Sequence, residues 1–104
     1  MPRGITFTTV NVLHAVASGS RHGFDIIDAT GLPSGTVYPA LGRLERDGLV
    51  RSSWEDPAAA REEKRPPRRY YKVTAQGARV LETELLKYRA LSPIRTPNPA
   101  RGRG

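Results

Sequence analysis

The chain has 104 residues, a length that gives one small domain a modest core and leaves little for a second domain. Its formal net charge is +7, and the excess of lysine and arginine falls in residues 57–104, which indicates a polyanionic partner. The absence of cysteine excludes disulfides and thiolate metal sites. No apolar run is long enough to span a bilayer, and the first residues lack the apolar segment of a secretory signal. We therefore expect a soluble intracellular protein with no membrane partner.

Three short helices are predicted in the first half from apolar residues at helical intervals. The first covers residues 5–18. The second covers 21–29 and is followed by Gly31, which takes the left-handed conformation that ends a helix. The third runs over 33–47. Because Pro39 inside it has no N–H to donate, we expect a bend or an irregular turn there.

A hairpin follows the three helices. Residues 49–55 are predicted to form a strand in which Trp54 lies in the core or an interface. Residues 56–68 are rich in proline, alanine and charge, and are predicted to be a loop. Residues 69–74, rich in aromatic and β-branched side chains, are predicted to form the antiparallel partner strand.

The remaining chain is predicted to be one helix and a tail. Thr74 is suited to cap a helix over 75–91, and the proline- and arginine-rich residues 92–104 are expected to be a disordered basic tail. The fold class is therefore mainly α with a small β-hairpin: a winged helix-turn-helix domain over residues 1–74, followed by a C-terminal dimerisation helix.

Four stretches resemble the PadR family of bacterial regulators, and they span roughly residues 8–91. The matching stretches are His22–Ile26, Gly35–Leu41, Leu44–Leu49, and Arg69–Thr74 with Gly77 after it. Three departures accompany the likeness. Ser34 precedes the glycine where the family usually has proline, Phe24 replaces a usual tyrosine, and Lys64 stands where the loop usually carries glycine before its Arg-Pro.

The resemblance implies a cytoplasmic homodimer that binds a palindromic operator in double-stranded DNA and represses transcription. The third helix would lie in the major groove, and the basic loop would contact the backbone or the minor groove. The residues expected to contact DNA are Ser34, Thr36, Tyr38, Arg43, Lys64, Arg65, Arg68, Arg69 and Tyr70. The alternatives are that Tyr38 packs partly in the core, that Thr36 merely stabilises the first turn of the helix, and that the loop charges are only solvated.

An apolar stripe on the last helix is expected to pair with a second subunit, together with the first helix, because it extends past the core of so small a domain. The residues expected at this interface are Val12, Leu81, Leu85, Tyr88 and Leu91. By analogy with related regulators, Trp54 is the position at which a small hydrophobic or aromatic effector could stack.

No catalytic arrangement is found in the sequence. His14 and His22 share no ligand set with acidic residues at metal spacing, and no nucleophile–base pair or phosphate-cradling loop occurs. We therefore expect neither an enzyme nor a bound metal or cofactor. Two other functions stay open at this point, a winged-helix module that binds a protein and a sequence-neutral nucleic-acid binder, and activation is an alternative to repression.

Overall fold

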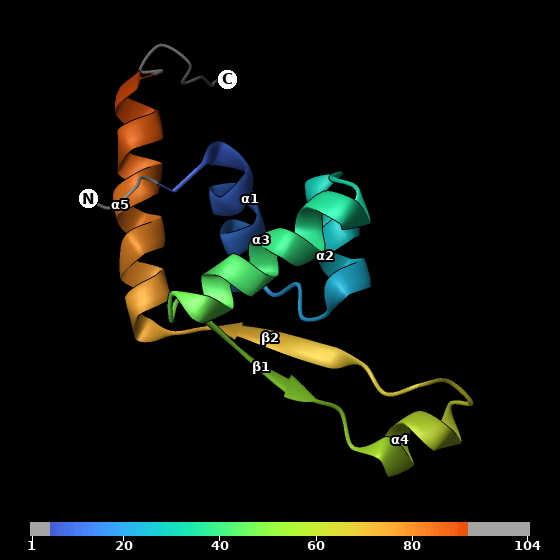
Figure 1. The fold of residues 1–104 in the computed structure, drawn as a ribbon. Coiled ribbons are helices and arrows are strands. Elements are labelled where there is room, and N and C mark those ends of the chain that lie inside the picture. The colour runs from blue at the N-terminus through green and yellow to red at the C-terminus, as the bar shows by residue number, and fades with distance from the viewer. Residues whose placement is uncertain (1–4, 92–104) are drawn as a thin grey trace, which may run out of the picture.

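The computed structural model describes residues 5–91 (Figure 1). The expected tail at 92–104 and the side chain of Leu91 lie outside the described part. The elements in chain order are α1 (Phe7–Ala17), α2 (Gly23–Thr30), α3 (Ser34–Arg46), β1 (Val50–Trp54), α4 (Pro57–Glu62), β2 (Arg69–Val73) and α5 (Ala75–Leu91). Three helices followed by a hairpin form the predicted winged helix-turn-helix arrangement, and α5 follows it as expected.

The first three helices begin and end at residues whose chemistry explains the boundary. Thr6 caps α1 by accepting a hydrogen bond from the Thr9 amide at 3.1 Å. Gly31 ends α2 in the left-handed region, with φ 73°. Helix α3 continues through Pro39, so of the bend or irregular turn expected there, the irregular turn does not occur. Proline removes one backbone hydrogen bond, and no atom outside the helix crowds Gly35 one turn earlier.

The core lies among α1, α2, α3 and the base of the hairpin. Its largest fully buried side chains include Leu13 of α1, Ile26 of α2 and Leu41 of α3, each of which contributes about 1.5–3 kcal/mol by leaving water. Val12 is 0 % exposed within the single chain. Its assignment to a subunit interface is therefore wrong, because its side chain offers no surface to a partner. Leu81 of α5 is also buried in this core, so α5 packs on the winged domain itself.

The hairpin pairs β1 with β2 in antiparallel register, from Val50 opposite Val73 to Trp54 opposite Arg69. The two valines reach the core, whereas Trp54 lies beyond it and is 64 % exposed, so of the two expected positions, core or interface, the core is excluded. The chain just before α2 adds to the sheet, because the Tyr71 amide donates to the Arg21 carbonyl at 2.7 Å. This contact fixes the start of α2 against the hairpin.

The tip of the hairpin carries the short helix α4, where the sequence predicted an irregular loop. Asp56 caps it by accepting from the Ala58 amide at 3.0 Å, Pro57 is its first residue, and alanines follow. This is a strong helix start, and the buried side chain of Ala60 holds the turn in place. Lys64, two residues after α4, has a φ of 57°.

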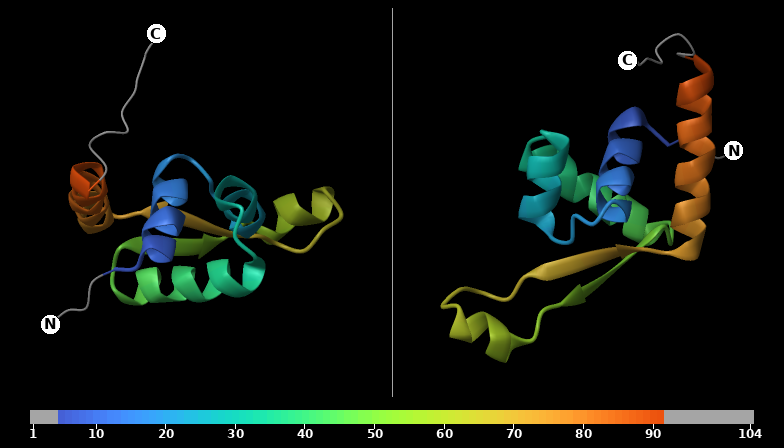
Figure 2. Two further views of the ribbon diagram at one scale, coloured as in Figure 1. Left: turned by 90° about the horizontal axis from the view of Figure 1, so that it is seen from above. Right: turned by 180° about the vertical axis from the view of Figure 1, so that it is seen from behind.

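Helix α5 stands upright along α1, on the side of the molecule away from the hairpin tip (Figures 1 and 2). The Thr74 hydroxyl accepts from the Gly77 amide at 3.0 Å, which confirms the predicted cap, and donates to the Gly48 carbonyl at 2.7 Å. Gly77 lies so close to the Leu49 carbonyl that a Cβ there would overlap it. The first turn of α5 is thus fixed to the base of the hairpin.

Candidate nucleic-acid interface

The N-terminal half of α3 presents its hydroxyl side chains to solvent. Ser34 is exposed, Thr36 is half-buried, and Tyr38 is 45 % exposed. No side chain caps this helix, since Pro33 occupies the N-cap position. The Thr36 amide donates to the Pro33 carbonyl at 2.9 Å, which leaves the Ser34 and Gly35 amides and these hydroxyls to hydrogen-bond phosphate oxygens or base edges.

Tyr38 is positioned by the first residue of α2. A Cβ added at Gly23 would overlap the Tyr38 phenol, so the ring lies directly over the glycine backbone. The absence of a side chain at Gly23 lets the phenol lie across the junction of the two helices. Tyr38 is 45 % exposed, so the alternative in which it packs partly in the core stays compatible with the structure, while part of the residue remains accessible from solvent.

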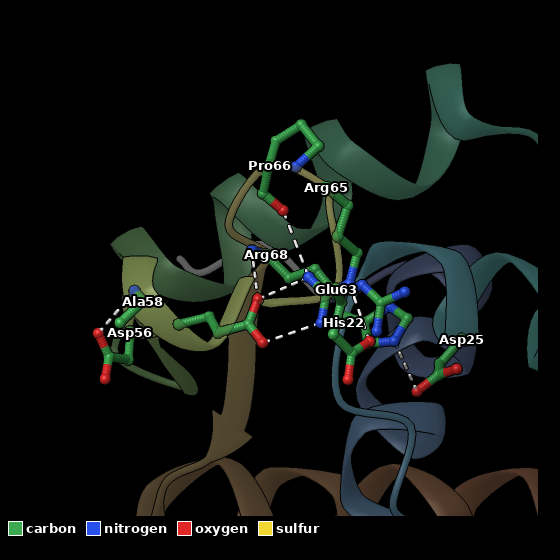
Figure 3. A network of polar contacts seen from close by, with 9 residues as sticks. His22, Asp25, Asp56, Ala58, Glu63, Arg65, Pro66 and Arg68 are labelled. Carbon is green, nitrogen blue, oxygen red and sulfur yellow. Dashed lines mark hydrogen bonds and ion pairs between the residues drawn. The ribbon is translucent and has the colours of Figure 1, made fainter. Parts of the chain in front are cut away.

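An ion pair between Arg65 and Glu55 stabilises the wing, which is the hairpin of β1 and β2 with the segment between them (Figure 3). Arg65 donates through both terminal nitrogens to the Glu55 carboxylate, at 2.7 and 2.9 Å, and the Arg68 amide donates to the same carboxylate at 3.1 Å. The bidentate hydrogen bonds from Arg65 are the main reason that the pKa of Glu55 falls to about 2. Arg65 therefore forms an ion pair within the hairpin, whereas the sequence predicted that it contacts DNA.

A second network joins the wing to the end of α3. Ser52 donates to Glu45 at 2.6 Å and accepts from Arg69 at 2.9 Å, while the guanidinium of Arg69 also lies 5.4 Å from the centroid of the Trp54 ring. Arg69 is therefore held on the hairpin. Among residues 5–91, no ion pair engages the side chains of Lys64 and Arg68, which leaves them available to an anion.

The remaining expected contacts divide between packing and solvent. Tyr70 packs against His22, with 5.8 Å between the two ring centroids. The Arg21 guanidinium lies 5.5 Å from the centroid of the Tyr70 ring. The neighbouring Tyr71 turns inward, and burial raises its pKa, so the two tyrosines divide between the faces of the strand as expected. Arg43 points toward α1, where its guanidinium lies 3.5 Å from the Thr9 hydroxyl.

A groove separates α2 and α3 from the wing and brings the two halves of the interface together. It has a volume of about 460 Å³, and Tyr38 on α3 faces Arg68 and Arg69 across it. Phe24 also lines this groove, and the sequence analysis did not assign it a site. A signal was present, since Phe24 is a large apolar residue beside two acidic residues at the outer face of a short helix.

A basic hollow on the other face of the hairpin was also missed. Arg21, Arg51 and Lys72 line it together with Tyr70. Arg51 and Lys72 are opposite one another in the strand register, so their side chains leave the same face of the sheet. The sequence predicted both strands but not their register, and strand alternation places the two charges together only once the register is known.

Within residues 5–91, no group of three histidine or acidic side chains is arranged to hold a metal ion. None of the helices in that part of the chain has the length and apolar character needed to cross a bilayer.

The sequence and the fold of this chain are similar to those of known proteins. The model of the transcriptional regulator PadR-like family matches residues 12–83, which is more than half of the chain. This chain belongs to the PadR-like family. No curated protein matches the sequence.

Solved structures of two PadR proteins and of one further DNA-binding protein have a similar fold. A PadR family transcription regulator from hypervirulent Clostridium difficile superposes with a TM-score of 0.74 at 21 % identity, covering 86 % of this chain and 94 % of that one. A PadR-like transcription factor from Bacteroides fragilis gives 0.68 at 26 % identity, covering 82 % of each chain. Bordetella bronchiseptica BpsR, whose DNA binding is described as regulated by 6-hydroxynicotinic acid, gives 0.69 at 24 % identity over 92 % of this chain and 66 % of that one.

The PadR assignment confirms the family resemblance and the winged-helix fold predicted from sequence. It establishes the protein as a DNA-binding transcriptional regulator.

Proposed function

We propose that this PadR protein is a cytoplasmic repressor that binds a palindromic operator as a homodimer. The observation that carries the proposal is the arrangement of α3 and the wing, with exposed hydroxyl groups on one and available cations on the other, on the two sides of a single groove. Two such surfaces related by two-fold symmetry would meet half-sites about one DNA turn, ~34 Å, apart.

Within each subunit, we assign base-edge and phosphate contacts to Ser34, Thr36 and Tyr38 and backbone contacts to Lys64 and Arg68. The support is exposure and charge: the hydroxyls surround the uncapped start of α3, and the two cations have no acidic partner among residues 5–91. Arg65 and Arg69 act by holding the wing in shape, through Glu55 and Ser52 respectively.

The dimer interface is proposed on the outer face of α1 and α5. Phe7 is 65 % exposed with its ring edge-on to Tyr88 at 5.5 Å between centroids, and Leu86 also projects into solvent. A hollow of about 300 Å³ lined by Leu81, Leu85 and Leu86 continues this face. A second copy of α5 would cover these apolar side chains, and residues 75–91 would then serve as the dimerisation helix.

Repression would follow from occupation of the promoter, and a small effector would relieve it. The support for an effector is the family fold and the description of BpsR as a protein whose DNA binding a small molecule regulates. The protein has no need of an enzymatic step or a cofactor for this function.

Fluorescence anisotropy with the DNA upstream of the gene tests the proposal, using a scrambled duplex as competitor and a salt series. Binding that resists the competitor and falls with a log–log salt slope of about −0.9 per neutralised phosphate supports it. Equal affinity for both duplexes would instead favour a sequence-neutral binder. Absence of binding at low salt to this fragment and to a random genomic library would favour a protein-binding module.

A further inference from the structure

The outer face of the hairpin carries the basic hollow, which is separate from the proposed DNA-binding surface. Arg51 of β1 and Lys72 of β2 leave the sheet on the face opposite Ser52, which hydrogen-bonds to Glu45 of α3. Helices α1, α2 and α3 all lie on the side of Ser52, and both Arg51 and Lys72 are exposed (Figures 1 and 2). The hollow and the groove between α3 and the wing have only Tyr71 in common among their lining residues.

Three cations meet at this hollow without an acidic partner. Arg21, Arg51 and Lys72 line it, its volume is about 360 Å³, and none of its lining residues is acidic. Among residues 5–91, no ion pair involves any of the three side chains. The Asp25 carboxylate accepts from the Arg21 amide at 3.5 Å, but its ion pair is with His22 at 3.4 Å. The three positive charges are therefore left for an anion from outside the chain.

The placement of these charges costs stability in the free protein. Arg51 and Lys72 are directly opposite one another in the strand register, where like charges repel. Arg21 is held beside β2 by two contacts: its carbonyl accepts from the Tyr71 amide at 2.7 Å, and its guanidinium lies 5.5 Å from the centroid of the Tyr70 ring. An anion bound among the three cations would relieve this repulsion, and no side chain of the hollow does so.

We propose that this hollow binds two linked phosphate groups, as in inorganic pyrophosphate or the phosphate chain of a nucleotide. A guanidinium donates two parallel hydrogen bonds to phosphate oxygens, an ammonium adds a point charge, and the exposed Ser53 hydroxyl adds a donor. Orthophosphate carries about two negative charges at neutral pH, fewer than the three cations, whereas two linked phosphates carry more. The ligand is therefore a diphosphate and not a single phosphate.

Titration of the whole chain with pyrophosphate, followed in a proton–nitrogen correlation spectrum, tests the proposal. Each backbone amide gives its own signal, so binding at the hollow is distinguished from attraction to the other cations of this basic chain. We expect saturable movement of the Arg51, Ser53 and Lys72 amide signals and about tenfold weaker binding of orthophosphate. No saturable movement of these signals, or equal affinity for the two anions, would overturn the proposal. ADP distinguishes the two sources: tighter binding than pyrophosphate indicates a nucleotide, and equal or weaker binding indicates an inorganic diphosphate.

Two charge-reversal variants provide a matched pair. Lys72→Glu replaces the repulsion from Arg51 by an attraction, so the urea midpoint should rise while pyrophosphate affinity falls by about tenfold or more. Arg79→Glu makes the same charge change at an exposed position of α5 outside the hollow, and it should keep the affinity within about twofold because salt screens distant charges. Arg51→Gln, which removes a charge without reversing it, should also weaken binding. Equal losses of affinity in Lys72→Glu and Arg79→Glu would show a general attraction to a basic chain and overturn the proposal.

The position of the hollow predicts that DNA and pyrophosphate bind at the same time. At constant ionic strength, pyrophosphate should move the Arg51 and Lys72 amide signals in the DNA-bound protein as it does in the free protein. Release of labelled DNA by pyrophosphate under these conditions would place the ligand on the DNA-binding surface and overturn the proposal. Failure of the protein to bind any DNA would refute the proposed function, while the titration without DNA would still decide whether the hollow binds a diphosphate.

Discussion

The phenol of Tyr38 on α3 fills the space in which a side chain on Gly23 of α2 would lie. The start of α2 and the outward face of α3 are therefore matched in shape at one residue of each helix. Since the Tyr38 ring also lines the groove that faces the wing, the glycine determines where an exposed aromatic hydroxyl is presented.

Gly23→Ala should displace the Tyr38 ring, because the new methyl group and the phenol cannot occupy the same space. The ring is the free end of a side chain, so the loss of stability should be modest, about 1 kcal/mol, while operator affinity falls about tenfold. Tyr38→Ala should lower affinity by a similar factor. In a double-mutant cycle measured by anisotropy, Gly23→Ala should have no further effect once Tyr38 is absent; additive losses would separate the two residues.

Lys64→Gly should raise stability and lower DNA affinity at the same time. Lysine at φ 57° pays about 1 kcal/mol that glycine does not, so the urea midpoint should rise. Loss of the charge should reduce the salt slope of operator binding by about 0.9 per subunit. Lys64→Ala, which loses the charge but keeps the backbone strain, is the control. An unchanged salt slope in both variants would remove Lys64 from the DNA interface.

The ion pair of Glu55 with Arg65 should make the wing sensitive to acid. The pKa of Glu55 in the folded protein is about 2, below its ordinary value of 4.5, because Arg65 stabilises the ionised carboxylate. The stability from this group is therefore complete above about pH 5 and is lost as the pH falls toward 2. Urea unfolding of the wild type and Glu55→Gln at pH 7, 4.5 and 3 should show a difference that shrinks with acid. A constant difference would contradict the assignment.

Leu86→Glu should convert the proposed dimer to monomers with the fold retained. Leu86 is exposed within one chain, whereas Leu85 packs partly on the core and its substitution would damage the fold as well. Sedimentation velocity measures the change, and circular dichroism monitors the fold. Thr83→Glu, which adds the same charge at another exposed position of α5, is the control. A Leu86→Glu protein that remains dimeric would place the interface elsewhere.

Sequence reasoning located those elements whose signals are local. The extent of α5 was predicted correctly because Thr74 caps it and its apolar residues recur at helical intervals, and the end of α2 was predicted because Gly31 adopts a left-handed conformation. Helix α4 was missed because its six residues are too few for a periodic pattern, although Asp56 and Pro57 carried the cap signal.

What the sequence could not supply were relationships between distant residues. Val12 shares its helical stripe with other apolar residues, and only the packed structure shows that it faces the core. Arg65 stabilises the wing through the carboxylate of Glu55, which lies ten residues earlier in the chain. The sequence shows the charge of Arg65 but not the residue with which it pairs. The groove around Tyr38 and Trp54 is formed by three elements that come together only in the fold.

The junction of α5 with the hairpin has a consequence for operator architecture. The Thr74 hydroxyl bonds to Gly48, and the close approach of Gly77 to Leu49 leaves no room for adjustment, so α5 cannot turn independently of the winged domain. In the proposed dimer, the distance between the two recognition helices would then be set by α5 packing and not by a flexible linker. Such a dimer selects operators by half-site separation: inserting one base pair at the centre, ~3.4 Å of rise, should weaken binding even when every contacted base is kept.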